Sequence, residues 1–227
     1  MGKKTFLPYG KQSIDEDDVA AVLEVLNSDW LTTGPAIEKF ESCLTERVGV
    51  AHGIACSNGT AALHLAARAL DLNPGDYVVV PAITFLATAN AIRFVGAEVL
   101  FSDVDPDTGL MRPEDLEAVL DAHPEKPVRA VCPVHLAGQT VDMPKISMIA
   151  KMRNLVVIED ACHALGTTYH DADGKEYAVG DCRHSDMAIF SFHPVKTLTT
   201  GEGGMITLNH SGMATRLKLL RNHGMVR

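Results

Sequence analysis

Short apolar runs alternate with amphipathic stretches along most of the chain. From residue 53 onward, each run ends in turn-forming residues, and the stretch that follows carries apolar side chains three or four positions apart. Short runs predict strands, and the wider spacing predicts helices. We expect strands at 53–56, 77–80, 98–101, 128–134, 155–158, 186–192 and 204–208, and helices at 61–70, 87–95, 113–120, 145–151 and 213–222. This order indicates an α/β fold with a mostly parallel sheet covered by helices on both faces.

Two further helical patterns precede the first strand. Residues 15–26 carry acidic side chains at their start and apolar side chains at helical spacing, which is typical of an amphipathic helix whose positive dipole end attracts negative charge. Residues 37–48 have a similar pattern. We therefore expect an N-terminal helical segment, 1–30, followed by one large domain, 31–227.

The composition narrows the class of protein. Apolar residues make up 46% of the chain and charged residues 22%, as in ordinary globular proteins. The formal net charge of −9 argues against nucleic-acid binding, which needs a basic surface. No stretch reaches the roughly 18 apolar residues of a membrane span, and residues 1–11 have no apolar run after their lysines, so we expect no signal peptide. These features predict a cytoplasmic protein with neither nucleic acid nor membrane as partner.

The cysteines are odd in number and scattered, mostly in apolar stretches: Cys43, Cys56, Cys132, Cys162 and Cys182. This usage predicts reduced, buried thiols. Histidines follow two of these cysteines closely, but the spacing fits no common metal site, and we predict no bound metal.

Residues 57–60, Ser-Asn-Gly-Thr, lead into a predicted helix. Ligands bind at the carboxyl ends of the strands in such sheets, and a helix N-terminus offers free N–H groups to a phosphate. Gly59 and Thr60 are therefore candidate phosphate ligands, with a plain helix cap as the alternative.

Asp160 follows a predicted buried strand. A buried acidic side chain is costly without a partner, and a protonated pyridine nitrogen is one partner that fits. A helix cap or a structural salt bridge is the open alternative.

Lys196 follows another apolar strand, with polar residues around it. A desolvated lysine has a lowered pKa and can act as a nucleophile, whereas a surface lysine at a strand end would have no such role. Ser191 is a candidate phosphate ligand on the same strand. The glycine-rich loop 199–204 has neither the Walker lysine pattern nor the Rossmann glycine pattern.

These segments, taken together and in this order, resemble a known family. The matching stretches are 57–63, 81–90, 103–106, 133–139, 158–166, 190–196 and 201–204. The chain resembles the DegT-type sugar aminotransferases, which are pyridoxal 5′-phosphate (PLP) enzymes of fold type I. Stretches 190–196 and 221–225 are most similar to the aminotransferases of pseudaminic acid synthesis. That resemblance implies a UDP-linked 4-keto-6-deoxy amino sugar as substrate, glutamate as amino donor and a role in polysaccharide biosynthesis.

The resemblance also implies a role for each candidate residue. Lys196 forms the internal aldimine and later moves the proton, and Asp160 pairs with the pyridine nitrogen. His163 contacts the phenolic oxygen of the ring, and Phe85 stacks on the ring face. The remaining residues share the task of holding the phosphate: Gly59, Thr60 and Ser191.

The 227 residues depart from the family pattern at their C-terminal end. Family members continue into a small C-terminal domain and take one phosphate-loop residue from a partner subunit. We therefore expect a homodimer only for the complete protein, and poor PLP binding and little activity for this chain.

Three alternatives remain at this point. A non-catalytic scaffold or fragment would keep the fold without the reaction. Sugar dehydratases of the same family carry histidine in place of the lysine, so Lys196 favours an aminotransferase. A nucleotide-binding α/β protein is disfavoured because the usual phosphate motifs are missing.

Overall fold

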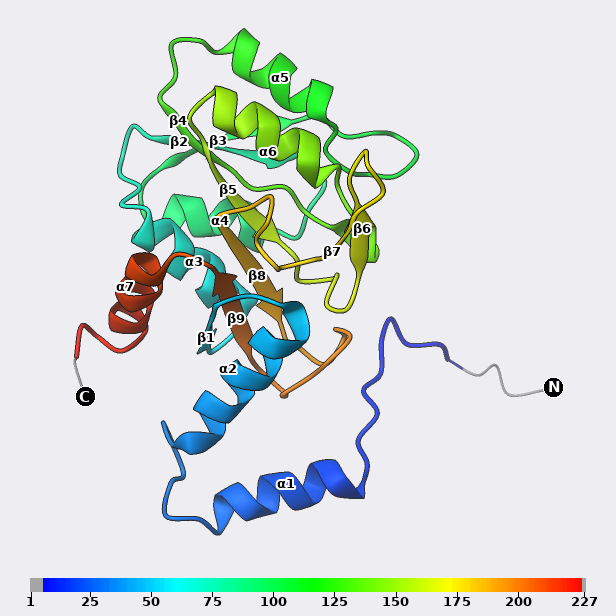
Figure 1. Ribbon diagram of the computed structural model, residues 1–227, viewed down its shortest axis with the longest axis vertical. Helices are drawn as coiled ribbons and strands as arrows, with labels where there is room; N and C mark the ends of the chain where they lie inside the picture. The colour runs from blue at the N-terminus through cyan, green and yellow to red at the C-terminus, as the bar shows by residue number, and fades with distance from the viewer. Residues whose placement is uncertain (1–5, 226–227) are drawn as a thin grey trace, which may run out of the picture.

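A seven-stranded sheet runs through the computed structural model, which describes residues 6–225 (Figure 1). The strand order is β1-β9-β8-β5-β4-β2-β3. Strands β8, β5, β4, β2 and β3 pair in parallel, whereas β9 is antiparallel to both of its neighbours. The strands are β1 (His52–Cys56), β2 (Tyr77–Pro81), β3 (Glu98–Ser102), β4 (Val128–Val131), β5 (Val156–Asp160), β8 (Met187–Ser191) and β9 (Gly204–Leu208).

Helices cover both faces of this sheet and enclose two apolar clusters. One cluster contains Val78, Val80 and Ile189 and is covered by α3 (Gly59–Ala69), α4 (Ala87–Phe94) and α7 (Ser211–Arg221). The other contains Val79 and Phe190 and is covered by α2 (Pro35–Val48), α5 (Pro113–Ala122) and α6 (Met143–Met152). Neighbouring strand residues belong to opposite clusters because side chains alternate across a strand. The predicted fold class, α/β with a mostly parallel sheet and helices on both faces, is confirmed.

Some element boundaries differ from the prediction. Strand β4 ends at Val131 and not at residue 134, because Pro133 has no N–H to continue the ladder. A hairpin of β6 (Thr168–His170) and β7 (Glu176–Ala178) was not expected. Its strands are very short and largely exposed, so they carry no apolar run that periodicity could detect.

The N-terminal helix α1 (Glu16–Leu26) forms as expected and is capped by Asp15, whose carboxylate accepts the N–H groups of Asp17 and Asp18. None of its residues is buried, and the helix lies apart from the sheet (Figure 1). Residues 1–5 of the predicted segment 1–30, which bear on the signal-peptide prediction, and residues 226–227 lie outside the described residues. Within 6–225, no helix combines the length and the hydropathy that a membrane crossing requires.

The edge strand β1 is covered by two charged side chains. The N–H of Ala55 donates to Oε1 of Glu41 on α2 at 2.8 Å. The carbonyl of Ala55 accepts from Arg221 on α7 at 3.0 Å, and Arg221 also pairs with Glu41. Backbone groups that would otherwise remain open at the sheet edge therefore have partners.

Gly204 marks the closest approach of β9 to α3. A Cβ at this position would lie 2.4 Å from the carbonyl carbon and oxygen of Asn58, which are backbone atoms that cannot move aside alone. We predict that Gly204→Ala lowers the free energy of unfolding by about 2 kcal/mol, as overpacking of a close contact does. Urea unfolding measures the change.

The matched control is Gly212→Ala in α7. A Cβ there would lie 3.0 Å from Cε1 of His210, whose Nδ1 accepts the N–H of Met213, and a small shift of this ring relieves the contact without moving the backbone. Its effect should stay within about 0.5 kcal/mol, as for other surface substitutions. Equal stability of the two variants would contradict the close approach at Gly204.

Candidate active site

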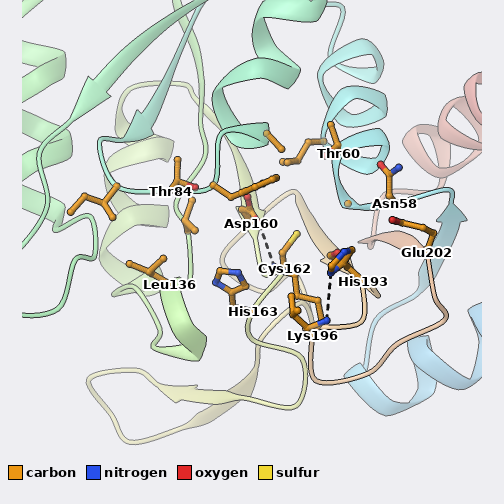
Figure 2. A pocket seen from close by; sticks show the side chains of 18 of the residues that line it. Asn58, Thr60, Thr84, Leu136, Asp160, Cys162, His163, His193, Lys196 and Glu202 are labelled. Carbon is orange, nitrogen blue, oxygen red and sulfur yellow. Dashed lines mark hydrogen bonds between the residues drawn. The ribbon is translucent and has the colours of Figure 1, made fainter. Parts of the chain in front are cut away.

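A cavity of about 630 Å³ lies where β5 and β8 end and where α3 begins. Figure 2 shows side chains of its lining residues pointing into a common space. This position agrees with the rule that ligands bind outside the carboxyl ends of parallel strands. The cavity brings together all of the sequence-predicted site residues: Gly59, Thr60, Phe85, Asp160, His163, Ser191 and Lys196.

The N-terminus of α3 forms one corner of this cavity. The side chain of Asn58 accepts the N–H of Ala61 at 2.8 Å and caps the helix, so the plain-cap alternative is also part of the geometry. The N–H groups of Gly59 and Thr60, at the start of the same turn, have no partner within the helix. They provide two donors for an anion beside Ser191.

Gly59 is required for this corner to form. A Cβ on this residue would lie 3.0 Å from Cβ of Ser191 and 3.2 Å from Sγ of Cys162. The missing side chain lets α3 approach β8 and leaves room in which a phosphate fits.

Asp160 ends β5 and is only 5% exposed. Its Oδ2 accepts the hydroxyl of Thr88 at 2.8 Å, and its Oδ1 accepts the N–H of Cys162 at 3.2 Å. Both carboxylate oxygens therefore accept a hydrogen bond from the protein, and these two bonds hold the side chain in the wall of the cavity.

His163 lies beside Asp160 in the cavity wall, and its Nδ1 accepts the N–H of Ala137 at 3.3 Å. Burial lowers the pKa of His163, and the positive charge of Lys196 lowers it further, while Asp160 opposes the shift. The ring is therefore neutral near pH 7. With Nδ1 occupied as an acceptor, the proton resides on Nε2, which can donate to a ligand oxygen.

Lys196 is half-buried in the cavity and not a free surface lysine. Its backbone N–H donates to the carbonyl of His193 at 2.9 Å, which fixes the turn after β8. Phe85 also lines the cavity and is 71% exposed, so its ring is open to a ligand. Tyr9, from the segment before α1, also lines the cavity, which the sequence did not predict.

Glu159 is a second buried acid that sequence reasoning left without a role. It is 1% exposed and accepts from Nε2 of His135 at 3.0 Å, from the N–H of Gly180 at 3.1 Å and from the hydroxyl of Ser185 at 2.7 Å. The N–H of Val141 donates to Nδ1 of His135, so Nε2 carries the proton. The available signal was the pair of consecutive acids at a strand end, which must face opposite sides.

All five cysteines are free thiols, but only Cys132 is buried, because Cys43 is exposed and the other three are partly exposed, so the prediction of buried thiols is wrong for most of them. Burial raises the pKa of Cys162 and Cys132 well above the usual value, and the charge of Asp160 raises it further, so both are neutral. Within the described residues, no group of histidine, cysteine or acidic side chains is arranged to hold a metal ion.

Solved structures of similar fold include aminotransferases, one of them in its PLP form. PseC of Helicobacter pylori, an aminotransferase of pseudaminic acid biosynthesis, matches with a TM-score of 0.88 and 31% identity over 97% of this chain and 57% of its own. A protein of Streptococcus pneumoniae described as a sugar aminotransferase matches in its PLP form with a TM-score of 0.87 and 30% identity, over 97% and 59% of the two chains. The same protein is also known in a pyridoxamine phosphate form.

The fold is therefore that of the fold type I PLP-dependent aminotransferases. The sequence profile of the DegT/DnrJ/EryC1/StrS aminotransferase family matches residues 12–227, and the chain belongs to this family. The prediction of PLP as cofactor is thereby confirmed. GDP-perosamine synthase of Caulobacter vibrioides is 42% identical over 213 residues, which are 93% of this chain and 54% of that protein. The chain thus spans about half the length of the relatives it matches.

Glu159 should be needed for stability because its buried carboxylate accepts hydrogen bonds from three groups of the protein itself. Replacing it by glutamine, Glu159→Gln, places an NH₂ group against donors and removes the charge that they stabilise. We predict a loss of about 3 kcal/mol in the free energy of unfolding, as for other broken buried networks. Urea unfolding measures the change.

Glu176→Gln is the matched control, since the Glu176 side chain is 61% exposed and only near His170 and Thr168. Its effect should stay within about 0.5 kcal/mol. If both glutamine variants unfold alike, the buried network contributes little.

The lowered pKa of His163 predicts that acid destabilises the fold. In the unfolded chain, His163 binds a proton near pH 6.5, whereas in the folded chain it binds that proton only at a lower pH. The free energy of unfolding should therefore be highest above pH 6.5 and should fall as the pH drops below that value. His163→Gln should flatten this slope in unfolding curves measured from pH 7.5 to pH 5.

His184 contributes in the same direction, because burial also lowers its pKa, so the slope should diminish without vanishing. His170→Gln, at a side chain that is 58% exposed, serves as the control and should keep the slope of the unaltered chain. An unchanged slope in the His163→Gln variant would show that folding does not lower the pKa of His163.

Proposed function

We propose that this chain supplies the PLP-binding half of a sugar aminotransferase that moves an amino group from glutamate to a UDP-linked 4-keto-6-deoxy sugar. The observation that carries the proposal is one cavity that contains Lys196, the buried carboxylate of Asp160 and the anion corner of α3. The relatives support the coarser class, because they include perosamine and pseudaminic acid enzymes. The small C-terminal domain, the homodimer and the cytoplasmic location stay predictions.

When bound, PLP supplies an electron sink that stabilises negative charge next to the amino group. Asp160, held by Thr88 and the N–H of Cys162, would accept a hydrogen bond from the ring nitrogen and so keep that nitrogen protonated. His163 would donate from Nε2 to the phenolic oxygen, and Phe85 would stack on the ring.

Lys196 would hold the cofactor through its side-chain nitrogen and would move the proton at the substrate carbon, a role typically worth 10²–10⁴-fold in rate. The N–H groups of Gly59 and Thr60, with the hydroxyl of Ser191, hold the phosphate and so fix the cofactor relative to this lysine.

The relatives differ in the nucleotide that their sugars carry. One relative is named for a GDP sugar, and DesI was solved with a TDP-sugar product at 32% identity and a TM-score of 0.83. We favour UDP because stretches 190–196 and 221–225 resemble the pseudaminic acid enzymes. UDP-, GDP- and TDP-linked keto sugars should therefore be compared directly as amino acceptors.

The two alternative functions have less support. A dehydratase would carry histidine at the position of Lys196, and a non-catalytic scaffold would not need a lysine and a fixed carboxylate in one cavity. The expectation that the chain binds PLP weakly and turns over little is kept in the proposal. Robust turnover by the purified 227-residue chain would contradict that expectation.

The first test of the proposal is covalent trapping. The purified chain is titrated with PLP, its visible absorbance is recorded, and borohydride reduction is followed by peptide mass mapping. We predict a visible band and a reduced PLP adduct on Lys196, both lost in Lys196→Ala.

Lys145→Ala is the control for this experiment, because the side chain of Lys145 is 65% exposed on α6 and pairs with Asp142 outside the cavity. It should keep both the band and the adduct on Lys196. Labelling spread over surface lysines, or no specific label, would overturn the proposed site.

A further inference from the structure

A chain of hydroxyl groups connects the cavity wall with Asp160. The hydroxyls of Thr84 and Thr88 lie 2.8 Å apart, and Thr88 lies 2.8 Å from Oδ2 of Asp160. Thr84 lines the cavity just before α4, whereas Thr88, in the first turn of α4, is 1% exposed. Figure 2 shows Thr84 and Asp160 on the same side of the cavity.

The direction of this hydrogen-bond chain follows from the carboxylate at its end. An ionised carboxylate only accepts, so the single hydroxyl proton of Thr88 must point to Asp160. Thr88 then has no proton left for its neighbour, and Thr84 must donate to it. The order of donation is therefore Thr84 to Thr88 to Asp160.

We propose that Thr88, supported by Thr84, is a positioning residue that sets the orientation and charge of Asp160 toward the ring nitrogen of PLP. The inference rests on the proposed function and deepens it. The two oxygens of Asp160 are held from two separate segments: Oδ1 by the N–H of Cys162 in its own loop, and Oδ2 by Thr88 from α4. Two bonds in different directions fix the plane of the carboxylate, which a single bond does not.

Within the described residues, the Cys162 thiol is a second side chain that interacts with the Asp160 carboxylate by hydrogen bonding, and a thiol is a weaker donor than the Thr88 hydroxyl. Asp160 interacts electrostatically with Cys132, which follows β4, and with Cys162 and His163 in the next loop. Lys196, after β8, interacts with the same Cys162 and His163. The two thiols are neutral because burial raises their pKa, and His163 is neutral because burial lowers its pKa. Lys196 is engaged by the cofactor, so the hydroxyl of Thr88 remains the support for Oδ2.

Loss of the hydroxyl should change the cofactor as well as the protein. In Thr88→Val, Oδ2 loses its donor, the carboxylate can rotate, and the ring nitrogen shares its proton less fully. A less positive ring withdraws less charge from the lysine–PLP nitrogen, whose proton then leaves at higher pH.

The experiment compares PLP binding and spectra in four variants of the full chain. Dissociation constants come from absorbance titrations with PLP, and the visible band of the bound cofactor is recorded from pH 5 to pH 10. We expect Thr88→Val to weaken PLP binding roughly tenfold, the scale of one charge-assisted hydrogen bond, and to raise the midpoint of the band by roughly one pH unit. Thr88→Ser keeps the hydroxyl and should restore both values to within about twofold and a few tenths of a unit.

Two further variants separate positioning from general destabilisation. Thr84→Val keeps the Thr88–Asp160 bond and should give shifts in the same direction but smaller. Thr207→Val removes another fully buried hydroxyl. Thr207 lies on β9, is not among the residues that line the cavity, and donates to the carbonyl of Gly180 at 2.8 Å. This substitution should lower thermal stability while leaving the PLP dissociation constant and the pH midpoint unchanged.

The outcomes distinguish this inference from the proposed function. If the unaltered chain gives no PLP adduct on Lys196, both fall together. If the unaltered chain binds PLP at Lys196 and Thr88→Val has the same dissociation constant and pH midpoint, only the role of Thr88 is overturned. The role of Thr88 is also overturned if Thr207→Val shifts the pH midpoint as much as Thr88→Val does.

Discussion

Two consecutive acids at the end of β5 constrain both sides of the sheet. Because side chains alternate along a strand, Glu159 and Asp160 point to opposite faces, and each is almost fully buried. Glu159 fastens the segment around Gly180 and Ser185 to the sheet, while Asp160 presents its charge to the cavity. Burying a charge is costly unless donors surround it, so the same strand end that carries the site also fixes the loops beside it.

Close backbone approach is the second requirement of the site. Glycines at 59 and 204 let the N-terminus of α3 lie directly against β8 and β9, so that its free N–H groups meet Ser191 at one corner. The anion corner is therefore a product of packing between three elements, and the sequence pattern of a capped helix is only its local part.

The pattern of apolar and polar residues along the chain predicts most of the fold, and it also points to the candidate site residues that follow buried strands. Apolar runs reveal buried strands, and Asp160 and Lys196 stand out because each follows such a run. Thr88 could not be found in this way, since it lies 72 positions from Asp160 and only the folded sheet brings them together. The same holds for the donors of Glu159, and for the β6–β7 hairpin, whose short exposed strands leave no periodic signal. Roles that depend on one residue type at a strand end are visible in sequence, whereas roles that depend on a partner from a distant segment are not.

The Glu41–Arg221 pair over Ala55 has a consequence for the order of folding. Strand β1 is made early, but within residues 6–225 it pairs with β9 alone, and the arginine at its outer edge lies 180 positions after Glu41. During synthesis, β1 is therefore unpaired on both sides until β9 and α7 have emerged. Pairings of such long separation form slowly, and an open strand can join another chain in the meantime. The edge of β1 can therefore be covered only after α7 is made, and the strand stays open to pairing with other chains until then.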